Sequence, residues 1–413
     1  MTLSNAEFSS TTFSGFAWFG GAAFSGDTTF GGVTFSSDAG FSRARFSGPA
    51  WFGGAAFYGP GEFYETTFSS PAVFEGATFS SDADFRKAAF SDEAEFRRVT
   101  FSGPAVFDGA TFSSDANFHE AVFETAAHVG PLVCQGALDL RGARFNSPVT
   151  IQAAATHLEG QRTRWDSIAA LRLRYATVDL SDAVFECPLT IVTQTAHFTA
   201  PGGAVLAEGQ LVGSDPGARV ASLRGADAAH LLLHNVDLSA CLLSGTVHLD
   251  QLRLEGECPL APAPSGLRRR GLFVVRWTAR RTLIEEQHWR ARRGCSGWAA
   301  APDGTEVIGP AGLAPVYRQL RKSFEDGKNE PDAVDFYYGE MEMRRHDRNR
   351  PIAERALLAL YWAVSGYGLR ASRALVWLLG AMAATVLVMM LWGLPLNDPK
   401  TATTGRLRSH LIW

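Results

Sequence analysis

The sequence predicts an all-β solenoid up to about residue 260, followed by an α-helical C-terminal region with one transmembrane helix. Three observations predict this fold class. Phenylalanine recurs at alternating steps of five and six residues as far as residue 123, and a small residue stands two positions before each of these phenylalanines. Residues 374–394 form an apolar run without a charge.

The phenylalanine repeat runs through the first 125 residues without a slip. Steps of five and six alternate, so the true period is eleven residues. An α-helix with about 3.6 residues per turn would scatter these rings around its axis, and Gly, Ser and Pro at this density would not sustain a long helix. The repeat therefore predicts short extended segments, with these rings inside: Phe8, Phe13, Phe19, Phe24, Phe30, Phe35, Phe41, Phe46, Phe52, Phe57, Phe63, Phe68, Phe74, Phe79, Phe85, Phe90, Phe96, Phe101, Phe107, Phe112, Phe118 and Phe123.

The position two residues before each phenylalanine is as regular as the phenylalanine itself. It is Ala in 16 of the 22 steps, for example Ala6, Ala77 and Ala110. Residues two apart on an extended segment point to the same side. Each step therefore offers one large and one small residue to the interior, while Ser, Gly, Asp and Thr between them suit turns and solvent.

These steps resemble the pentapeptide-repeat family, in which a small residue, a polar residue, Leu or Phe, and two turn residues follow one another. The resemblance implies a right-handed quadrilateral β-helix over residues 1–125, with four steps to a coil. Every second step carries one residue more than the family pattern, which a bulged corner would accommodate. Two stretches show the pattern most clearly: Ala77-Thr78-Phe79-Ser80-Ser81 and Ala110-Thr111-Phe112-Ser113-Ser114.

Residues 126–260 are predicted to continue the solenoid in degenerate form, with Leu in place of Phe. Leu233, Leu238, Leu243, Leu249 and Leu254 step by five, five, six and five residues. Two insertions, 153–170 and 192–218, are expected to leave the coil as loops or short helices.

Residues 261–315 are predicted to be an Arg-rich segment and a linker, and residues 316–350 a helical hairpin. Nine arginines fall between residues 267 and 293, where they could lie against anionic lipid headgroups. Tyr317, Leu320 and Phe324 share one helical face, and Pro331 opens a second helix. This hairpin looks like one tetratricopeptide-type repeat. Through 335–341 it is also similar to the helical segment before the membrane helix in actinobacterial pentapeptide-repeat membrane proteins.

Residues 374–394 are long enough to cross about 30 Å of hydrocarbon, and Trp377 and Trp392 stand near the ends of the run. The apolar stretch 356–369 is too short to span and is expected to be an interfacial or packed helix. Basic residues crowd the N-terminal flank of the span, which predicts a cell-membrane location with the solenoid on the cytoplasmic side. The N-terminus lacks the features of a secretory signal peptide, which agrees with a cytoplasmic solenoid. These flanking residues are Arg344, Arg345, Arg348, Arg350, Arg355, Arg370 and Arg373, against Lys400, Arg406 and Arg408 after the span.

The sequence offers no catalytic, cofactor-binding or metal-binding residues, so we expect neither an enzyme nor a cofactor. The five cysteines are scattered without a CxxC pair, which suggests neither a disulfide framework nor a zinc site. His230, His234 and His248 are closer together, but we interpret them as solvent-facing or core-edge residues. Residues 365–368 read Ser-Gly-Tyr-Gly, as in a potassium filter, but a loop between two helices is the favoured interpretation.

The leading functional hypothesis is a membrane-anchored scaffold that presents a rigid cytoplasmic surface to protein partners. A second hypothesis is a DNA-mimic regulator of a topoisomerase-like enzyme, because residues 1–127 carry 15 acidic and 6 basic residues. A third is a membrane-associated oxidoreductase. The partners are expected to be the membrane and proteins rather than nucleic acid. The acidic residues near the turns are Asp27, Asp38, Asp82, Asp92, Asp108 and Asp115.

Overall fold

The computed structural model describes residues 2–125, 128–200, 202–264, 266–270, 273–277 and 280–393, with only the backbone of Gln210, 266–270 and 273–277. The chain divides into two compact units, residues 1–349 and 350–413. The last residue of the predicted span, Leu394, lies outside the described residues. So do the basic residues after the span, Lys400, Arg406 and Arg408, and the side chains of Arg268, Arg269, Arg270 and Arg276.

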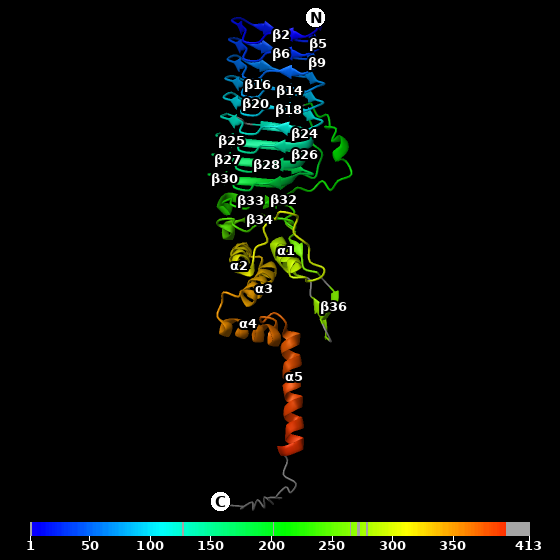
Figure 1. Cartoon of the computed structure of the whole chain (residues 1–413), viewed down its shortest axis with the longest axis vertical. Coiled ribbons are helices and arrows are strands. Elements are labelled where there is room, and N and C mark those ends of the chain that lie inside the picture. Colours follow the sequence, from blue (N-terminus) through cyan, green and yellow to red (C-terminus); the bar gives the residue numbers. More distant parts are fainter. Residues whose placement is uncertain are drawn as a thin grey trace, which may run out of the picture. The chain divides into compact units, whose positions relative to one another are not determined.

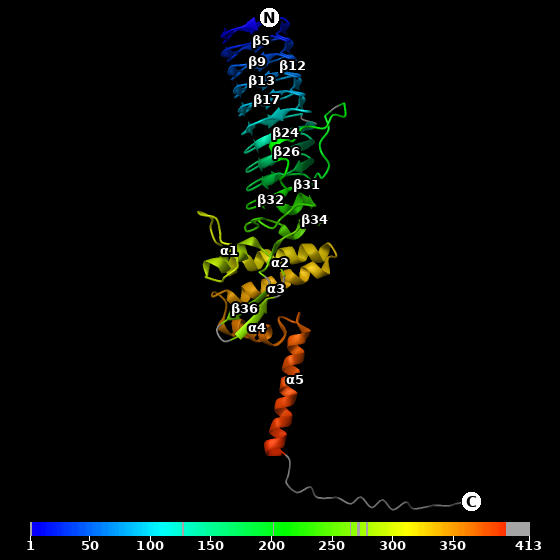
Figure 2. The same cartoon turned by 90° about the vertical axis from the view of Figure 1, so that its right-hand side faces the viewer.

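The first unit begins with a parallel β-solenoid of about eleven coils (Figures 1 and 2). In the regular part each strand pairs with the fourth strand after it, so that Ala50 lies beside Ala72 and Phe57 beside Phe79. Four strands therefore make one coil, which confirms the predicted quadrilateral β-helix. Each strand has two residues: it ends at the inward phenylalanine on faces 1 and 3 and one residue before it on faces 2 and 4.

The four faces of the regular solenoid are stacks of these strands. Face 1 holds β1 Thr2–Leu3, β5 Ala23–Phe24, β9 Arg45–Phe46, β13 Thr67–Phe68, β17 Ala89–Phe90 and β21 Thr111–Phe112. Face 2 holds β2 Ala6–Glu7, β6 Thr28–Thr29, β10 Ala50–Trp51, β14 Ala72–Val73, β18 Ala94–Glu95 and β22 Ala116–Asn117. Face 3 holds β3 Thr12–Phe13, β7 Thr34–Phe35, β11 Ala56–Phe57, β15 Thr78–Phe79, β19 Thr100–Phe101 and β23 Val122–Phe123. Face 4 holds β4 Ala17–Trp18, β8 Ala39–Gly40, β12 Gly61–Glu62, β16 Ala83–Asp84 and β20 Ala105–Val106.

Stacked phenylalanine rings fill the interior of the solenoid, as predicted. Phe74 lies parallel to Phe52 and Phe96, with ring centroids 4.8 and 4.9 Å apart. It also meets Phe63 and Phe85 edge to face, both at 5.4 Å. All five rings are fully buried. Parallel stacking along the axis and edge-to-face contact across it are both favourable arrangements of aromatic rings.

The corners explain why the steps alternate between five and six residues. After faces 2 and 4, two residues separate the inward phenylalanine from the next inward small residue, and the second of them takes a positive φ, for example 54° at Glu65 and 55° at Lys87. After faces 1 and 3 the corner has three residues, for example Ser47 to Pro49 between β9 and β10. The extra residue of every second step is therefore absorbed at two corners of each coil, as expected.

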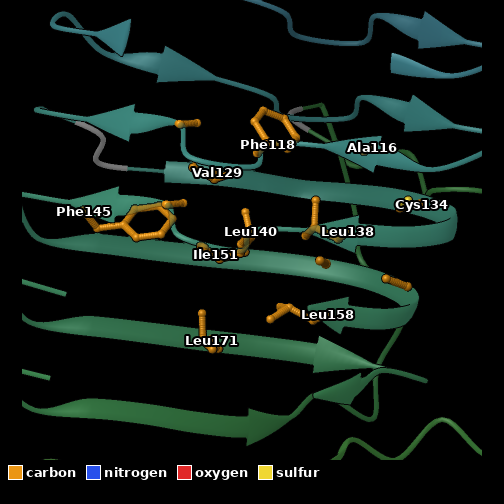
Figure 3. Close-up of a cluster of buried hydrophobic side chains, with 14 of the residues drawn as sticks. Ala116, Phe118, Val129, Cys134, Leu138, Leu140, Phe145, Ile151, Leu158 and Leu171 are labelled. Atoms are coloured by element: carbon orange, nitrogen blue, oxygen red, sulfur yellow. The ribbon is translucent and has the colours of Figure 1, made fainter. Parts of the chain in front are cut away.

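Beyond residue 125 the coil continues with a different length. Phe123 still pairs with Phe145 as in the regular coils. From there each coil is two residues shorter, because Phe145 pairs with Trp165 and Trp165 with Phe185. Strands lengthen across former corners (Figure 3). The strands β25, β27 and β30 keep two residues. The strands of this part are β24 His128–Asp139, β25 Arg144–Phe145, β26 Val149–Glu159, β27 Arg164–Trp165, β28 Ala169–Arg174, β29 Thr177–Asp179, β30 Val184–Phe185, β31 Leu189–Thr193, β32 Arg219–Ser222, β33 Leu231–His234 and β34 Arg253–Glu255.

One of the two predicted insertions is wrong and the other is found. Residues 153–170 do not leave the coil, because β26 and β28 pair side by side through them, with Ala153 against Leu173. Residues 194–217 do leave it, since Val178 pairs with Val220 and the chain between these partners is much longer than one coil. This segment, with the short 3₁₀ helix η1 Gly209–Leu211, is called the strap below.

Three helices close the C-terminal end of the solenoid. They are α1 Ile284–Arg292, α2 Pro310–Asp326 and α3 Glu330–His346, and α2 and α3 form the predicted hairpin. Leu252 and Leu260 of the last coil share one buried cluster with Tyr317, Leu320 and Phe324 of α2, so the core runs without a break from solenoid to helices. The remaining elements of this unit are η2 Ala228–His230, η3 Leu249–Gln251, β35 Ala261–Pro262 paired with β38 Arg281–Thr282, and the hairpin of β36 Gly266–Arg270 with β37 Phe273–Trp277.

The second unit contains α4 Ile352–Ser365 and α5 Ala371–Val388, which continues as a π-helical turn through Met389–Gly393. Residues 371–393 are long and apolar enough to cross a membrane, and none of α5 is buried. The apolar stretch 356–369 lies in α4 and the turn after it. Tyr367 is buried in that turn and meets the ring of Tyr361 edge to face. Residues 365–368 are therefore a loop between two helices, as favoured.

Candidate functional site: the outer surface of the solenoid and its helical cap

The outer surface of the regular solenoid repeats with every coil, so identical positions in successive coils form vertical ladders. On the corner after face 4, Arg43 contacts Glu65 at 2.9 Å and Lys87 contacts Glu65 at 3.6 Å. Tyr64 lies beside them, with the Lys87 ammonium 5.6 Å from its ring centroid. On the corner after face 2, Arg98 contacts Glu120 at 2.8 Å. These ion pairs link neighbouring coils, and they leave both corners nearly neutral.

The acidic residues proposed for DNA mimicry do not form one continuous face. Asp27 and Asp115 occupy the same corner but stand four coils apart, about 19 Å at the spacing of parallel strands. Pro49, Pro71 and Glu93 take the equivalent positions between them. Duplex DNA carries one charge per roughly 1.7 Å of its axis. Asp92 lies on this same corner. Asp38 and Asp82 lie on the corner after face 3, and Asp108 lies on the corner after face 4.

Large aromatic side chains are exposed on the first three coils. Phe16 and Trp18 stack at 5.6 Å and are 60% and 58% exposed. Trp18 lies across the backbone of Gly40 in the next coil, where a side chain would collide with its ring. Trp51 on face 2 and Tyr58 on the corner after face 3 are also exposed. Exposed aromatic residues are typical of protein-binding surfaces.

The strap covers part of the lower solenoid, beside β24 and β26 in both views (Figures 1 and 2). Phe198 and Leu206 of the strap form a small buried cluster with Val133 and Ala154, which point outward from the coils. A buried ion pair fixes the strap above them. The Arg174 guanidinium lies 2.7 Å from the Glu208 carboxylate, with side chains 3% and 1% exposed.

Two further side chains complete this ion pair. The Tyr175 hydroxyl donates a hydrogen bond of 2.6 Å to Glu208, and His197 lies 2.9 Å from the same carboxylate. Burial would raise the pKa of Glu208, but these hydrogen bonds and the Arg174 charge outweigh it and hold that pKa below its ordinary value. The carboxylate is therefore ionised at neutral pH and keeps the strap closed.

A second buried charge network lies inside the helical cap. Glu286 of α1 is fully buried and accepts from Arg280 at 2.5 Å, from Arg290 at 2.6 Å and from the Tyr317 hydroxyl. Arg290 also reaches Glu342 of α3 at 3.1 Å. Burial alone would raise the pKa of Glu286, but the two arginines outweigh it and lower the pKa. The network ties α1, α2 and α3 together.

This network corrects the prediction that the arginines of 268–293 face lipid together. Arg280 and Arg290 are 8% and 7% exposed in their side chains, because both are neutralised by buried glutamates. The sequence did not mark Glu285, Glu286 or Glu342 as structural residues. The sequence does contain one signal, a pair of adjacent glutamates inside an otherwise basic stretch. Because buried charges must be paired, such a pair indicates partners for buried arginines.

Glu285 joins the cap to the solenoid directly. Its carboxylate accepts the backbone N–H groups of Leu243 at 2.6 Å and Ser244 at 2.9 Å. These donors belong to a late coil and have no further coil to pair with. Burial raises the pKa of Glu285, and the two hydrogen bonds oppose that rise. The cap thus covers these backbone donors, which would otherwise be exposed at the solenoid end.

A cleft of about 920 Å³ remains between the last coil and the turn that joins α2 to α3. Residues 250–259 form one wall, while Ser323, Phe324 and Asp326 lie in the other. Lys322 reaches Asp250 across its margin at 2.7 Å, and the Ser323 hydroxyl donates to the Leu252 carbonyl at 2.6 Å. This cleft is one of the hollows that the described residues offer to a partner.

The histidines and cysteines singled out in the sequence do not gather into one site. His234 lies 3.7 Å from Glu255, His248 lies 2.9 Å from Asp227, and His230 ends η2. No group of three or more potential metal ligands occurs among the described residues. All five cysteines are free, and burial raises the pKa of Cys134 to about 12, so this thiol is a core residue.

The comparisons with known proteins agree with the fold. Residues 19–128 match the family of pentapeptide repeats (9 copies), in the overlapping stretches 19–67, 41–89, 52–100 and 85–128. This part of the chain therefore consists of pentapeptide repeats, as its residues predicted. No curated protein and no solved structure matches the chain. The narrower likeness to actinobacterial membrane proteins stays a prediction.

Proposed function

We propose that the chain is a membrane-anchored scaffold whose solenoid presents a rigid surface to protein partners. The observation that carries this proposal is the continuous core from the solenoid through α2 and α3. A solenoid whose coils contact only their neighbours, closed by a packed cap, holds outward side chains at fixed spacings. The ladders and the exposed aromatic residues of the first coils are the surface that such a scaffold would use.

The anchor in this proposal is α5 with its continuation to Gly393. Its length and apolar composition suit a membrane span, and no described residue buries its side chains. Arg370 and Arg373 precede the apolar run, as expected for the cytoplasmic end of a span. We therefore propose the cell membrane as the location, with the solenoid in the cytoplasm.

The two alternative functions find less support. Dispersed carboxylates, interrupted by Pro and by the corner cations, do not reproduce the charge density of duplex DNA. An oxidoreductase would need a cradle that holds a redox cofactor, and no observation on the described residues favours one. A supercoiling assay with a topoisomerase and the purified chain tests mimicry directly, because a DNA mimic inhibits the enzyme at a near-stoichiometric ratio.

Fractionation of cells tests the anchor. The full chain is expected in membranes, resistant to carbonate and released by detergent, whereas a chain ending at Asn349 is expected in the soluble fraction because residues 1–349 are a compact unit. A full chain that is soluble without detergent contradicts the proposal.

Crosslinking tests the scaffold. The variant W18A/W51A is expected to lose defined crosslinked partners with little loss of stability, because about half of each side chain is exposed. The matched control T78A/T100A changes two outward positions of face 3 and keeps those partners. Recovery of the same partners by both variants, or of none by the native chain, argues against the scaffold.

A further inference from the structure

The last strand of the solenoid has a free edge that faces the cleft. β34 pairs with β33 through Arg253, Leu254 and Glu255. The Glu255 carbonyl accepts the N–H of Asn235 at 3.0 Å, so the backbone groups of Glu255 point back toward the preceding coil. Successive residues of a strand direct these groups to opposite sides. The N–H and C=O of Leu254 therefore point away from β33, toward the cleft that Leu254 lines.

The cap leaves this edge uncovered while fixing the wall opposite to it. The Leu252 carbonyl on the same edge accepts the Ser323 hydroxyl, so the cap occupies one end of the edge. Arg281 pairs with Asp332 on the far side of the cleft. Between these contacts the Leu254 side chain packs on the core. Apart from its pairing with β33, the Leu254 backbone makes no hydrogen bond to another described residue. A fixed gap beside an unpaired strand edge is the geometry required for the addition of an extended peptide.

The charge of the cleft indicates the kind of peptide. Five carboxylates line it and only two arginines. Asp250 and Asp332 are neutralised by Lys322 and Arg281, but Glu257 and Asp326 make no side-chain hydrogen bond or ion pair with any other described residue. An occupant with cationic side chains gains attraction here, and an acidic one is repelled.

We propose that this cleft binds an extended basic peptide segment of a partner protein, which adds as one strand to the edge of β34. The inference rests on the proposed scaffold function and names the partner chemistry of one of its surfaces. The backbone of Leu254 supplies a donor and an acceptor, and Glu257 and Asp326 select for lysine or arginine.

The test uses the full chain in detergent and a fluorescein-labelled heptapeptide of alternating valine and lysine, measured by fluorescence anisotropy. The peptide is expected to bind the native chain. The double variant E257Q/D326N is expected to weaken binding about fivefold, because it removes two exposed carboxylates. The matched control D27N/D82N removes two exposed carboxylates from the solenoid corners and leaves binding unchanged. Equal weakening by both variants overturns the site, since it means that only net charge matters.

Strand addition has its own readout, which does not depend on any variant. A peptide of the same sequence with alternate N-methyl groups cannot donate along one edge, so it is expected to bind at least tenfold more weakly. A heptapeptide of valine and glutamate is expected not to bind. Equal binding of the methylated peptide overturns strand addition, and absence of any binding overturns the site. Neither result depends on membrane fractionation, so failure of the site and failure of the anchor are distinguishable.

Discussion

Replacement of Phe74 by Ala tests the ring ladder where it is most complete. Phe74 is fully buried, with a stacked ring above and below and an edge-to-face ring on either side. A phenylalanine truncated to alanine in a packed core destabilises by about 3–5 kcal/mol. The upper part of that range applies here, because parallel coils cannot collapse into the gap without breaking their register. Denaturant unfolding of the detergent-solubilised chain, followed by far-ultraviolet circular dichroism, measures the loss.

The matched control is Phe16→Ala, the same chemical change at a ring that is 60% exposed. It is expected to change the free energy of unfolding by no more than about 0.5 kcal/mol. Equal destabilisation by the two variants would refute the reasoning, since it would mean that the interior rings are not the source of stability. A loss of only part of the strand signal agrees with it, because coils interact with their nearest neighbours.

Three further predictions concern the cap and the strap. Gly339→Ala places a Cβ against the ring carbons of Tyr317, where there is no room for it. It is therefore expected to lower the thermal midpoint and to destabilise the fold by about 1–3 kcal/mol. The control Gly309→Ala meets no neighbouring atom and is expected to leave stability unchanged. The pKa of Glu342 is about 2, because surrounding arginines outweigh burial. Its stabilisation is therefore present above its unfolded pKa of about 4.3 and is lost as the pH falls toward 2, and acid titration of the E342Q variant should lack this step. Glu208→Gln leaves Arg174 buried without its counter-charge and is expected to destabilise strap closure by about 3–5 kcal/mol. Chymotrypsin should then cut the strap at least tenfold faster while R174M/E208L stays near the native rate, and an unchanged rate for E208Q would contradict the role of the pair.

The solenoid could be predicted from the sequence because one residue type marks every step. The error at residues 153–170 has a specific cause. The coil shortens there, and Trp165 replaces phenylalanine in the column, stacking on Phe145 at 4.1 Å. Both the spacing and the residue type changed at once, so the pattern vanished although the fold continued. The strap was found because residues 194–217 contain no inward pattern.

The cap could be predicted only as a hairpin. Periodicity gave the helices and their apolar face, for example Tyr317 and Phe324, but it does not say what that face covers. Glu285 and Glu286 look like surface residues by type. Only the fold shows that a late coil offers backbone donors to Glu285 and that arginines surround Glu286. The cleft depends on the distance between two walls that are remote in sequence, which no local pattern encodes.

The most direct test of the proposed scaffold is protease protection of an epitope tag placed before β1. Spheroplasts that express the full chain are treated with protease, intact or after lysis, and the tag is followed in the membrane fraction. The scaffold on the cytoplasmic side predicts a tag that sediments with membranes, survives in intact spheroplasts and is digested after lysis. A tag that remains soluble, or that is digested in intact spheroplasts, contradicts it.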